Sequence, residues 1–341
     1  MGAGRTRAVL SRLGLVAGGL GVGLLLAEAG VRILWTPPEI RRPVRPSPPP
    51  GVPELQHDVD LARPNASGVY NGAPYHANRY GFRGRDLSPE KPPGVFRIVV
   101  AGDSVVMGSG VADDEAYPAL LEALLNARAR EGRRYEVLNL GLIGLDLRGI
   151  LIRLERLAPA FSPDLVVYGC TLNDIKGLGF RNSATAAAFF AQQRAYNRFS
   201  RSPSHLLRVA WPHWLSLRDV LWPPPGTPLY EIRDNYFQNP PAWTAFEKHL
   251  DHLAGLGRTW HVPIVVFQHT ALEYLNPLHP YRDVYARIAE AAERRGMRTV
   301  QSFDAFRGHD EVSLWVSAVD AHPNAAGHRL LAAALAAGLD Q

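Results

Sequence analysis

Residues 96–105 read FRIVVAGDSV. The first part, Phe96–Ala101, is an apolar, β-branched run, which predicts a strand buried on both faces. It leads directly into Gly102-Asp103-Ser104-Val105, so a sharp turn follows the strand and Ser104 lies just before the next helix. Four further runs predict strands at 135–139, 164–168, 263–268 and 299–303, and the run at 164–168 is again apolar enough to be buried.

Helical patterns lie between these strands. Asp113 or Asp114 is expected to cap a helix whose apolar face carries four leucines, Leu120, Leu121, Leu124 and Leu125. The last helix is expected from about Ala325 to Leu339. Strands that alternate with helices predict a parallel sheet with helices on both faces. The fold class is therefore α/β, a three-layer α/β/α arrangement around a five-stranded parallel sheet.

The N-terminal segment, residues 1–35, has the pattern of a transmembrane helix or a signal peptide. Three arginines precede an uncharged run from Leu13 to Leu26, a pattern that keeps the N-terminus in the cytoplasm and sends the rest across the membrane. A cut after Ala27-Glu28-Ala29 fits the small-x-small rule of signal peptides. We favour an uncleaved anchor because the apolar pattern resumes from Val31 to Trp35. Either alternative places the remaining chain outside the cytoplasm, anchored or secreted.

The rest of the chain divides by composition. Residues 36–93 are predicted to be a Pro-rich linker followed by an extended surface segment, and residues 94–341 a globular domain. An insertion at 176–258, rich in aromatic residues, Arg and Pro, separates the third strand from the fourth. We expect mainly helices that pack on the domain, while a cap over the site or a membrane-facing patch is the alternative.

Composition and spacing exclude several classes of site. The 37 Lys and Arg residues are scattered rather than forming a stripe interleaved with aromatics, so nucleic-acid binding is not expected. Cys170 is the only cysteine in the sequence, which excludes an intramolecular disulfide and a cysteine-based zinc site. His249 and His252 share a helical face, but no carboxylate at metal-ligand spacing joins them. We therefore expect neither a metal nor another cofactor.

Five residues of the types that catalyse ester hydrolysis follow the first three predicted strands or precede the last helix. Ser104 is the candidate nucleophile, and its backbone N–H is a candidate oxyanion donor. The Gly144 N–H and the Asn173 amide, after the second and third strands, are further candidate oxyanion donors. His322 is the candidate general base, and Asp320 is the carboxylate that would orient it.

Each of these residues also has a structural interpretation as a helix cap, a turn residue or a surface histidine. Their order along the chain favours catalysis, because the carboxyl ends of parallel strands meet at one edge of the sheet and ligands bind there. His328, inside the last helix, is interpreted as structural.

The four blocks resemble those of the SGNH/GDSL hydrolase superfamily, named for its Ser, Gly, Asn and His. The resemblance runs from about Phe96 to the C-terminus, and it implies a flavodoxin-like fold and ester hydrolysis without a metal.

The chain departs from the superfamily's usual spacing in two blocks. Three residues separate Gly169 from Asn173 instead of one, and only Ala321 separates Asp320 from His322 instead of two residues. Some cell-envelope members resemble the shorter spacing of the last block, and in others a backbone carbonyl shares the orienting role.

These observations predict a membrane-anchored serine esterase that acts on acetyl or other short-chain esters, with an acylated glycan or lipid as the expected substrate class. An O-acyltransferase that modifies a cell-envelope polysaccharide remains an alternative, because the four blocks do not distinguish water from a glycan hydroxyl as acceptor. A non-catalytic envelope-binding module is the more distant alternative, since such a module would be expected to lack one of the four blocks.

Overall fold

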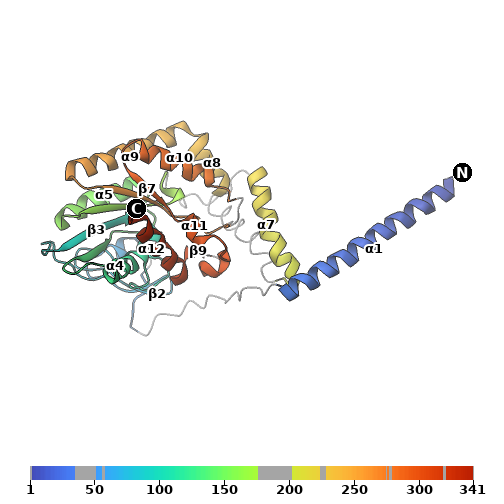
Figure 1. Ribbon diagram of the computed structural model, residues 1–341, viewed down its shortest axis with the longest axis horizontal. Coiled ribbons are helices and arrows are strands. Elements are labelled where there is room, and N and C mark those ends of the chain that lie inside the picture. Colours follow the sequence, from blue (N-terminus) through green and yellow to red (C-terminus); the bar gives the residue numbers. More distant parts are fainter. Residues whose placement is uncertain are drawn as a thin grey trace.

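A computed structural model describes residues 2–34, 51–55, 58–175, 202–222, 228–273, 275, 279–317 and 320–340. Five parallel strands form the central sheet in the order β4-β3-β5-β6-β7, which confirms the predicted five-stranded parallel sheet (Figure 1). Their bounds are β3 Val95–Gly102, β4 Arg134–Asn139, β5 Leu165–Cys170, β6 Ile264–Gln268 and β7 Arg298–Gln301. This order is that of flavodoxin-like folds, in which the parallel strands are added first on one side of the first strand and then on its other side.

Helices cover both faces of this sheet (Figure 1). One core cluster joins one face of the strands to α5 (Leu147–Leu157), α9 (Pro240–Trp260) and α10 (Arg282–Glu293). The other cluster joins the opposite face to α4 (Tyr117–Ala127), α11 (Phe303–Phe306) and α12 (Ala325–Leu339). Along β3 the side chains alternate between the two clusters, Val99 facing one and Val100 the other, as the two-residue period of a strand requires.

The other helices lie around the sheet, except α1 (Gly2–Leu34), which extends away from the domain (Figure 1). They are α2 (Asp58–Leu61), α3 (Ser104–Met107), α7 (His205–Leu221), α8 (Pro228–Phe237), η1 (Ala158–Phe161), η2 (Leu172–Ile175) and η3 (Glu311–Leu314). Two antiparallel hairpins complete the set, β1 (Ser67–Tyr70) with β2 (Ala73–His76), and β8 (Trp315–Ser317) with β9 (Asp320–Pro323). Asn71 and Gly72 join β1 to β2 with φ of 48° and 81°, the paired positive values of a type I′ turn.

Two local predictions differ from the structure. Ala116, not Asp113 or Asp114, is the N-cap of α4, and the Asp113 carboxylate instead pairs with Arg83 and His76. The fifth strand ends at Gln301 rather than at Phe303, which begins α11. The segment before the last helix is strand β9, and Asn324 after it caps α12.

The predicted insertion at 176–258 lies partly outside the described residues, which omit 176–201 and 223–227. Trp243 and Phe246 of α9 are buried, so this part packs on the domain as expected. Trp214 and Trp222, at α7, are exposed instead. The predicted domain boundaries at 35 and 93 remain a prediction, although Phe82 and Leu87 contribute to the core.

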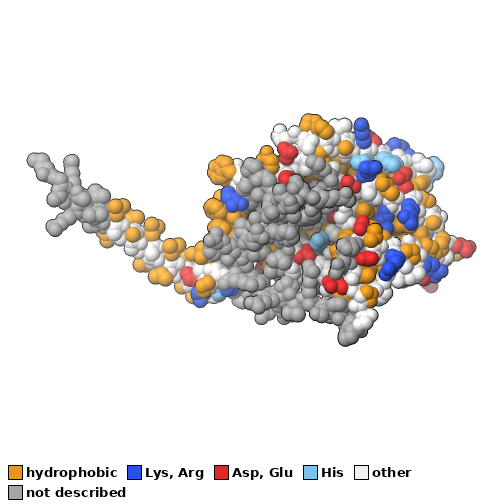
Figure 2. Space-filling view, turned by 180° about the vertical axis from the view of Figure 1, so that it is seen from behind, with side chains coloured by type: hydrophobic (Ala, Val, Ile, Leu, Met, Phe, Trp, Pro, Cys, Tyr) orange, Lys and Arg blue, Asp and Glu red, His pale blue; other side chains and the backbone are white. Residues whose placement is uncertain are grey.

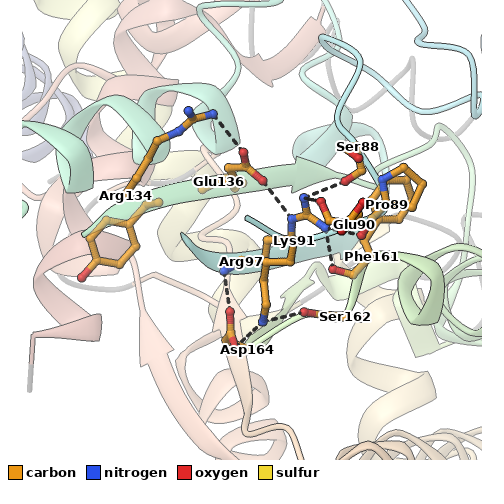
Figure 3. Close-up of polar contacts among 12 residues, drawn as sticks. Ser88, Pro89, Glu90, Lys91, Arg97, Arg134, Glu136, Phe161, Ser162 and Asp164 are labelled. Atoms are coloured by element: carbon orange, nitrogen blue, oxygen red, sulfur yellow. Dashed lines mark hydrogen bonds and ion pairs between the residues drawn. The ribbon is translucent and has the colours of Figure 1, made fainter. Parts of the chain in front are cut away.

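Arg97 is a charged residue in the middle of the buried strand β3, and its side chain is 0% exposed. Its guanidinium donates to Glu136 on β4 at 2.8 Å and to the backbone carbonyls of Ser88, Pro89, Glu90 and Phe161 (Figure 3). These bonds use all of its donor groups, which is the condition for burying a guanidinium. The interaction ties the segment before the sheet to two of its strands.

Candidate active site

Ser104 lies at the tight turn between β3 and α3. A Cβ atom on Gly102 would lie 2.2 Å from Val106 Cγ2 and 2.7 Å from the Gly169 carbonyl oxygen, so the turn requires glycine. The Asp103 carboxylate accepts a hydrogen bond from Val105 N–H at 3.0 Å and caps the short helix. Ser104 therefore begins a helix at the carboxyl end of a central strand, as the sequence predicted.

His322 and Asp320 reach the same place from strand β9. His322 Nε2 lies 2.8 Å from Ser104 Oγ, and His322 Nδ1 lies 2.5 Å from Asp320 Oδ1. Asp320 Oδ1 also accepts a hydrogen bond from the backbone N–H of His322 at 3.1 Å. Residues separated by 218 positions in the sequence thus form a continuous hydroxyl–imidazole–carboxylate chain. Such a chain can transfer a proton from a serine to a histidine that a carboxylate orients.

The electrostatic environment supports this direction of proton transfer. Burial lowers the pKa of His322, but the hydrogen bond and the negative charge of Asp320 outweigh this effect and leave the pKa above its ordinary 6.5. Burial raises the pKa of Asp320, yet its hydrogen bond and ion pair with His322 hold the pKa well below its usual range. Asp320 is therefore a carboxylate at neutral pH and stabilises a protonated His322.

Asn71, in the turn between β1 and β2, was not found by the sequence reasoning. Its Nδ2 donates to Asp320 Oδ2 at 2.9 Å and lies 3.1 Å from Ser109 Oγ. The only local signal was an Asn-Gly pair, which predicts a hairpin turn and not a contact across 249 positions. The second oxygen of Asp320 thus receives a partner from a segment that precedes the sheet.

The predicted oxyanion donors follow β4 and β5. Asn173, in η2, is partly buried, and its Nδ2 lies 3.5 Å from Asp103 Oδ2, next to the nucleophile. Gly144 is exposed in the loop after β4, with a φ of 70°. Both residues lie after strands adjacent to β3, since β3 pairs with β4 and with β5 in parallel register.

A buried network of hydrogen bonds joins Asp103, in the turn that carries Ser104, to residues at the end of β5. Thr171 Oγ1 lies 3.0 Å from Asp103 Oδ2 and 3.0 Å from Asp174 Oδ1, and Tyr168 OH donates to Asp174 at 2.6 Å. Burial, reinforced by the charge of Asp103, raises the pKa of Asp174 well above its usual value. A single threonine hydroxyl can donate to only one carboxylate, so a protonated Asp174 completes the network.

Glu273 is a further acidic residue beside the site. Burial raises its pKa, and the residue interacts electrostatically with both His322 and Asp320. The sequence contained no motif that would have singled it out. Among the described residues, no group of three or more His, Cys, Asp or Glu side chains could hold a metal ion. His252, one of the two histidines considered for a metal, pairs with Glu155 at 2.9 Å.

Comparisons with known proteins identify the family of the chain. The family model described as GDSL-like lipase/acylhydrolase matches residues 100–330. Among solved structures, LAE5, an α/β hydrolase enzyme from the metagenome of Lake Arreo in Spain, is 20% identical, with a TM-score of 0.44 over 74% of this chain and 98% of that chain. A catalytic mutant of Axe2, an acetylxylan esterase from Geobacillus stearothermophilus, is 18% identical, with a TM-score of 0.41 over 70% and 92% of the two chains. No curated protein matches the chain.

The matched region covers more than half of the sequence and contains every residue predicted for the site, Ser104, Gly144, Asn173, Asp320 and His322. The family match confirms the resemblance that these blocks indicated. The chain belongs to the GDSL-like lipase/acylhydrolase family and is an ester hydrolase.

Proposed function

We propose that the chain hydrolyses acyl esters through a Ser104-His322-Asp320 triad. The observation that carries this proposal is the continuous set of contacts from Ser104 Oγ to His322 at 2.8 Å and from His322 to Asp320 at 2.5 Å. A non-catalytic binding module would have no need for this arrangement.

In the proposed reaction, His322 Nε2 removes the Ser104 hydroxyl proton while Oγ attacks the carbonyl carbon of the ester. The negative charge that develops on the carbonyl oxygen is stabilised by three donors, the backbone N–H groups of Ser104 and Gly144 and the Asn173 amide. The tetrahedral intermediate collapses, the alcohol leaves with the proton from His322, and the acyl group remains on Ser104. His322 then activates water, which releases the acid and restores the serine.

We expect the acyl group to be acetyl or another short chain, carried by a glycan or a lipid. Polar side chains near the nucleophile support this expectation, because the partly exposed Asn173 and Glu273 offer partners to a small polar substrate rather than an apolar surface to a long alkyl chain.

A series of nitrophenyl esters from acetyl to dodecanoyl, with Ser104→Ala as the inactive control, tests this proposal. We expect the highest kcat/KM for acetyl or butanoyl and no hydrolysis by the control. Preference for dodecanoyl would refute the short-chain assignment. Product analysis with an oligosaccharide acceptor distinguishes the alternatives, because an O-acyltransferase would yield the acylated oligosaccharide while a hydrolase yields the free acid.

We also propose that the domain is anchored to a membrane and lies outside the cytoplasm. Residues Arg12–Leu34 of α1 form a helix long and apolar enough to cross a bilayer, and none of it is buried against the described domain. Length and composition alone also suit a signal sequence, so the proposal depends on retention of α1 in the mature chain. An extraction of membranes with alkaline carbonate tests it, since a chain with an intact transmembrane helix should stay in the pellet.

A further inference from the structure

Glu28 is an acidic residue inside the apolar helix α1, and its carboxylate contacts the start of α7. Glu28 Oε2 accepts a hydrogen bond from Ser204 Oγ at 2.7 Å and from Leu206 N–H at 2.9 Å, and Oε1 accepts from His205 N–H at 2.9 Å. The first N–H groups of a helix have no partner within it and carry partial positive charge, so a carboxylate is well suited to this position.

Arg32, one turn after Glu28 on α1, reinforces this contact. Its Nε donates to Glu28 Oε1 at 2.7 Å, and its Nη2 donates to the Pro203 carbonyl at 2.8 Å. The two charged residues that interrupt the apolar pattern of α1 therefore both serve to hold the start of α7. We call this set of contacts the α1–α7 joint.

Helix α7 has one face on the domain and one face without a described cover. Leu215 is buried and Trp211 partly buried in the core cluster that also contains Leu314 and Trp315, beside the hairpin of Asp320 and His322. The other face is an exposed apolar stripe with alternating spacings of three and four residues, formed by Leu207, Ala210, Trp214, Leu217 and Leu221. Trp222, which follows the helix, is 72% exposed.

The position of this stripe points to a lipid bilayer as its cover. In Figure 1, α7 begins beside the C-terminal end of α1 and is strongly inclined to it. It runs along the side of the domain from which α1 extends. Figure 2 shows hydrophobic side chains along α1 and again on the edge of the domain nearest to it. A helix that crosses a bilayer would thus bring the apolar stripe of α7 to the membrane surface. Tryptophan is enriched at the interface between lipid and water, and interfacial helices carry arginine beside their apolar face. On α7, the Arg218 guanidinium lies over the ring of Trp214.

We propose that α1 and α7 form one membrane-docking unit, in which α1 spans the bilayer and the stripe of α7 lies in the interface between lipid and water. The joint fixes α7 to α1, and α7 in turn holds the domain with the Asp320–His322 hairpin near the membrane surface. Cleavage after Ala29 would separate Glu28 from α7, so this unit exists only in a chain that retains α1. The inference rests on the membrane anchoring proposed above and does not depend on the catalytic roles proposed there.

The test uses the full chain in vesicles of phosphatidylethanolamine and phosphatidylglycerol, with an environment-sensitive fluorophore on an introduced cysteine. Cys170 is buried and is not labelled in the folded protein. Leu217→Cys reports on the stripe of α7, and Ile152→Cys, at an exposed apolar position on α5, is the matched control. Lipids that carry a nitroxide near the headgroup then quench whichever fluorophore lies in the interface.

We expect several-fold stronger quenching at position 217 than at position 152, and we expect Glu28→Ala to reduce this difference. Equally weak quenching at both positions would overturn the proposal. Cross-linking between copies at position 217 without lipid quenching would also overturn it, because a second copy would then cover the stripe. The mass of the chain recovered from membranes is a second readout, since retention of residues 1–29 supports the proposal and a new N-terminus at Gly30 contradicts it. Failure of the proposed triad would leave the quenching unchanged.

Discussion

Substitution of Asn71 by glycine removes a hydrogen-bond partner of the Asp320 carboxylate without disturbing the turn that carries residue 71. The Asn71 amide donates to Asp320 Oδ2 at 2.9 Å, from a backbone position with a φ of 48°. Glycine adopts positive φ without strain and is accepted at either central position of a type I′ turn. The change therefore removes only the hydrogen bonds of the side chain, to Asp320 and to Ser109.

The expected magnitude follows from the charge of Asp320. Hydrogen bonds to charged groups contribute about 1.5–3 kcal/mol, and each 1.4 kcal/mol of barrier corresponds to about a tenfold change in rate. If the whole contribution of the Asn71–Asp320 hydrogen bond is needed to keep Asp320 in contact with the protonated His322 ring, Asn71→Gly lowers kcat by about 10- to 100-fold. KM should change little, because Asn71 contacts the carboxylate and not the ester.

The assay is hydrolysis of a soluble acetyl ester, with Asn65→Gly as the matched control. Asn65 also has a positive φ, of 58°, but its side chain is exposed outside the site. Asn65→Gly should retain wild-type activity, and thermal unfolding of both variants should show that they remain folded. Wild-type kcat in Asn71→Gly would refute a positioning role, and a change confined to KM would assign Asn71 to substrate binding instead.

Three further predictions concern stability, pH and the turn. Arg97→Met leaves the buried Glu136 carboxylate with only the exposed Arg134 as an ion-pair partner and removes the donor of the backbone carbonyls that Arg97 binds, so it should lower the free energy of unfolding in urea by about 3–5 kcal/mol. Arg134→Met, at the exposed end of the same network, should cost under about 1 kcal/mol, and equal effects would contradict the burial argument. The proposed mechanism requires neutral His322, whose pKa is raised, so kcat/KM should fall as the pH drops through a midpoint above 6.5. A midpoint below 6.5 in the kcat/KM profile, which reports the free enzyme, would refute the assigned environment. Gly102→Ala places a methyl group 2.7 Å from the Gly169 carbonyl oxygen and should lower kcat by about a hundredfold through displacement of the nucleophile, so unchanged kinetics would contradict the tight turn.

The sheet and the main site residues could be predicted because their signals are local. Each buried strand is a short apolar run, and Ser104 and His322 lie next to strands or helices whose ends were visible in the sequence. The carboxyl ends of parallel strands meet at one edge, so the order of the blocks was enough to bring them together. The Asp320 carboxylate lies 2.5 Å from His322 Nδ1 despite the unusual spacing of the two residues, and its orienting role stays a prediction.

Features that depend on tertiary contacts could not be predicted in this way. Asn71 reaches Asp320 across the fold, and a hairpin turn in the sequence says nothing about what the hairpin contacts. Asp113 has the residue type of a helix cap, but the buried guanidinium of Arg83 competes for its carboxylate more effectively. Glu28 interrupts the apolar pattern of α1, and nothing near it in the sequence indicates its partners, which come from residues near position 205.

The central claim is that Ser104 is the nucleophile activated by His322. Labelling of the full chain with a fluorophosphonate, followed by mass analysis of the modified peptide, tests it most directly. The account predicts a covalent adduct on Ser104, with no adduct in Ser104→Ala and a much slower reaction in His322→Ala. Unlabelled Ser104 in an active enzyme, together with full ester hydrolysis by Ser104→Ala, would contradict it.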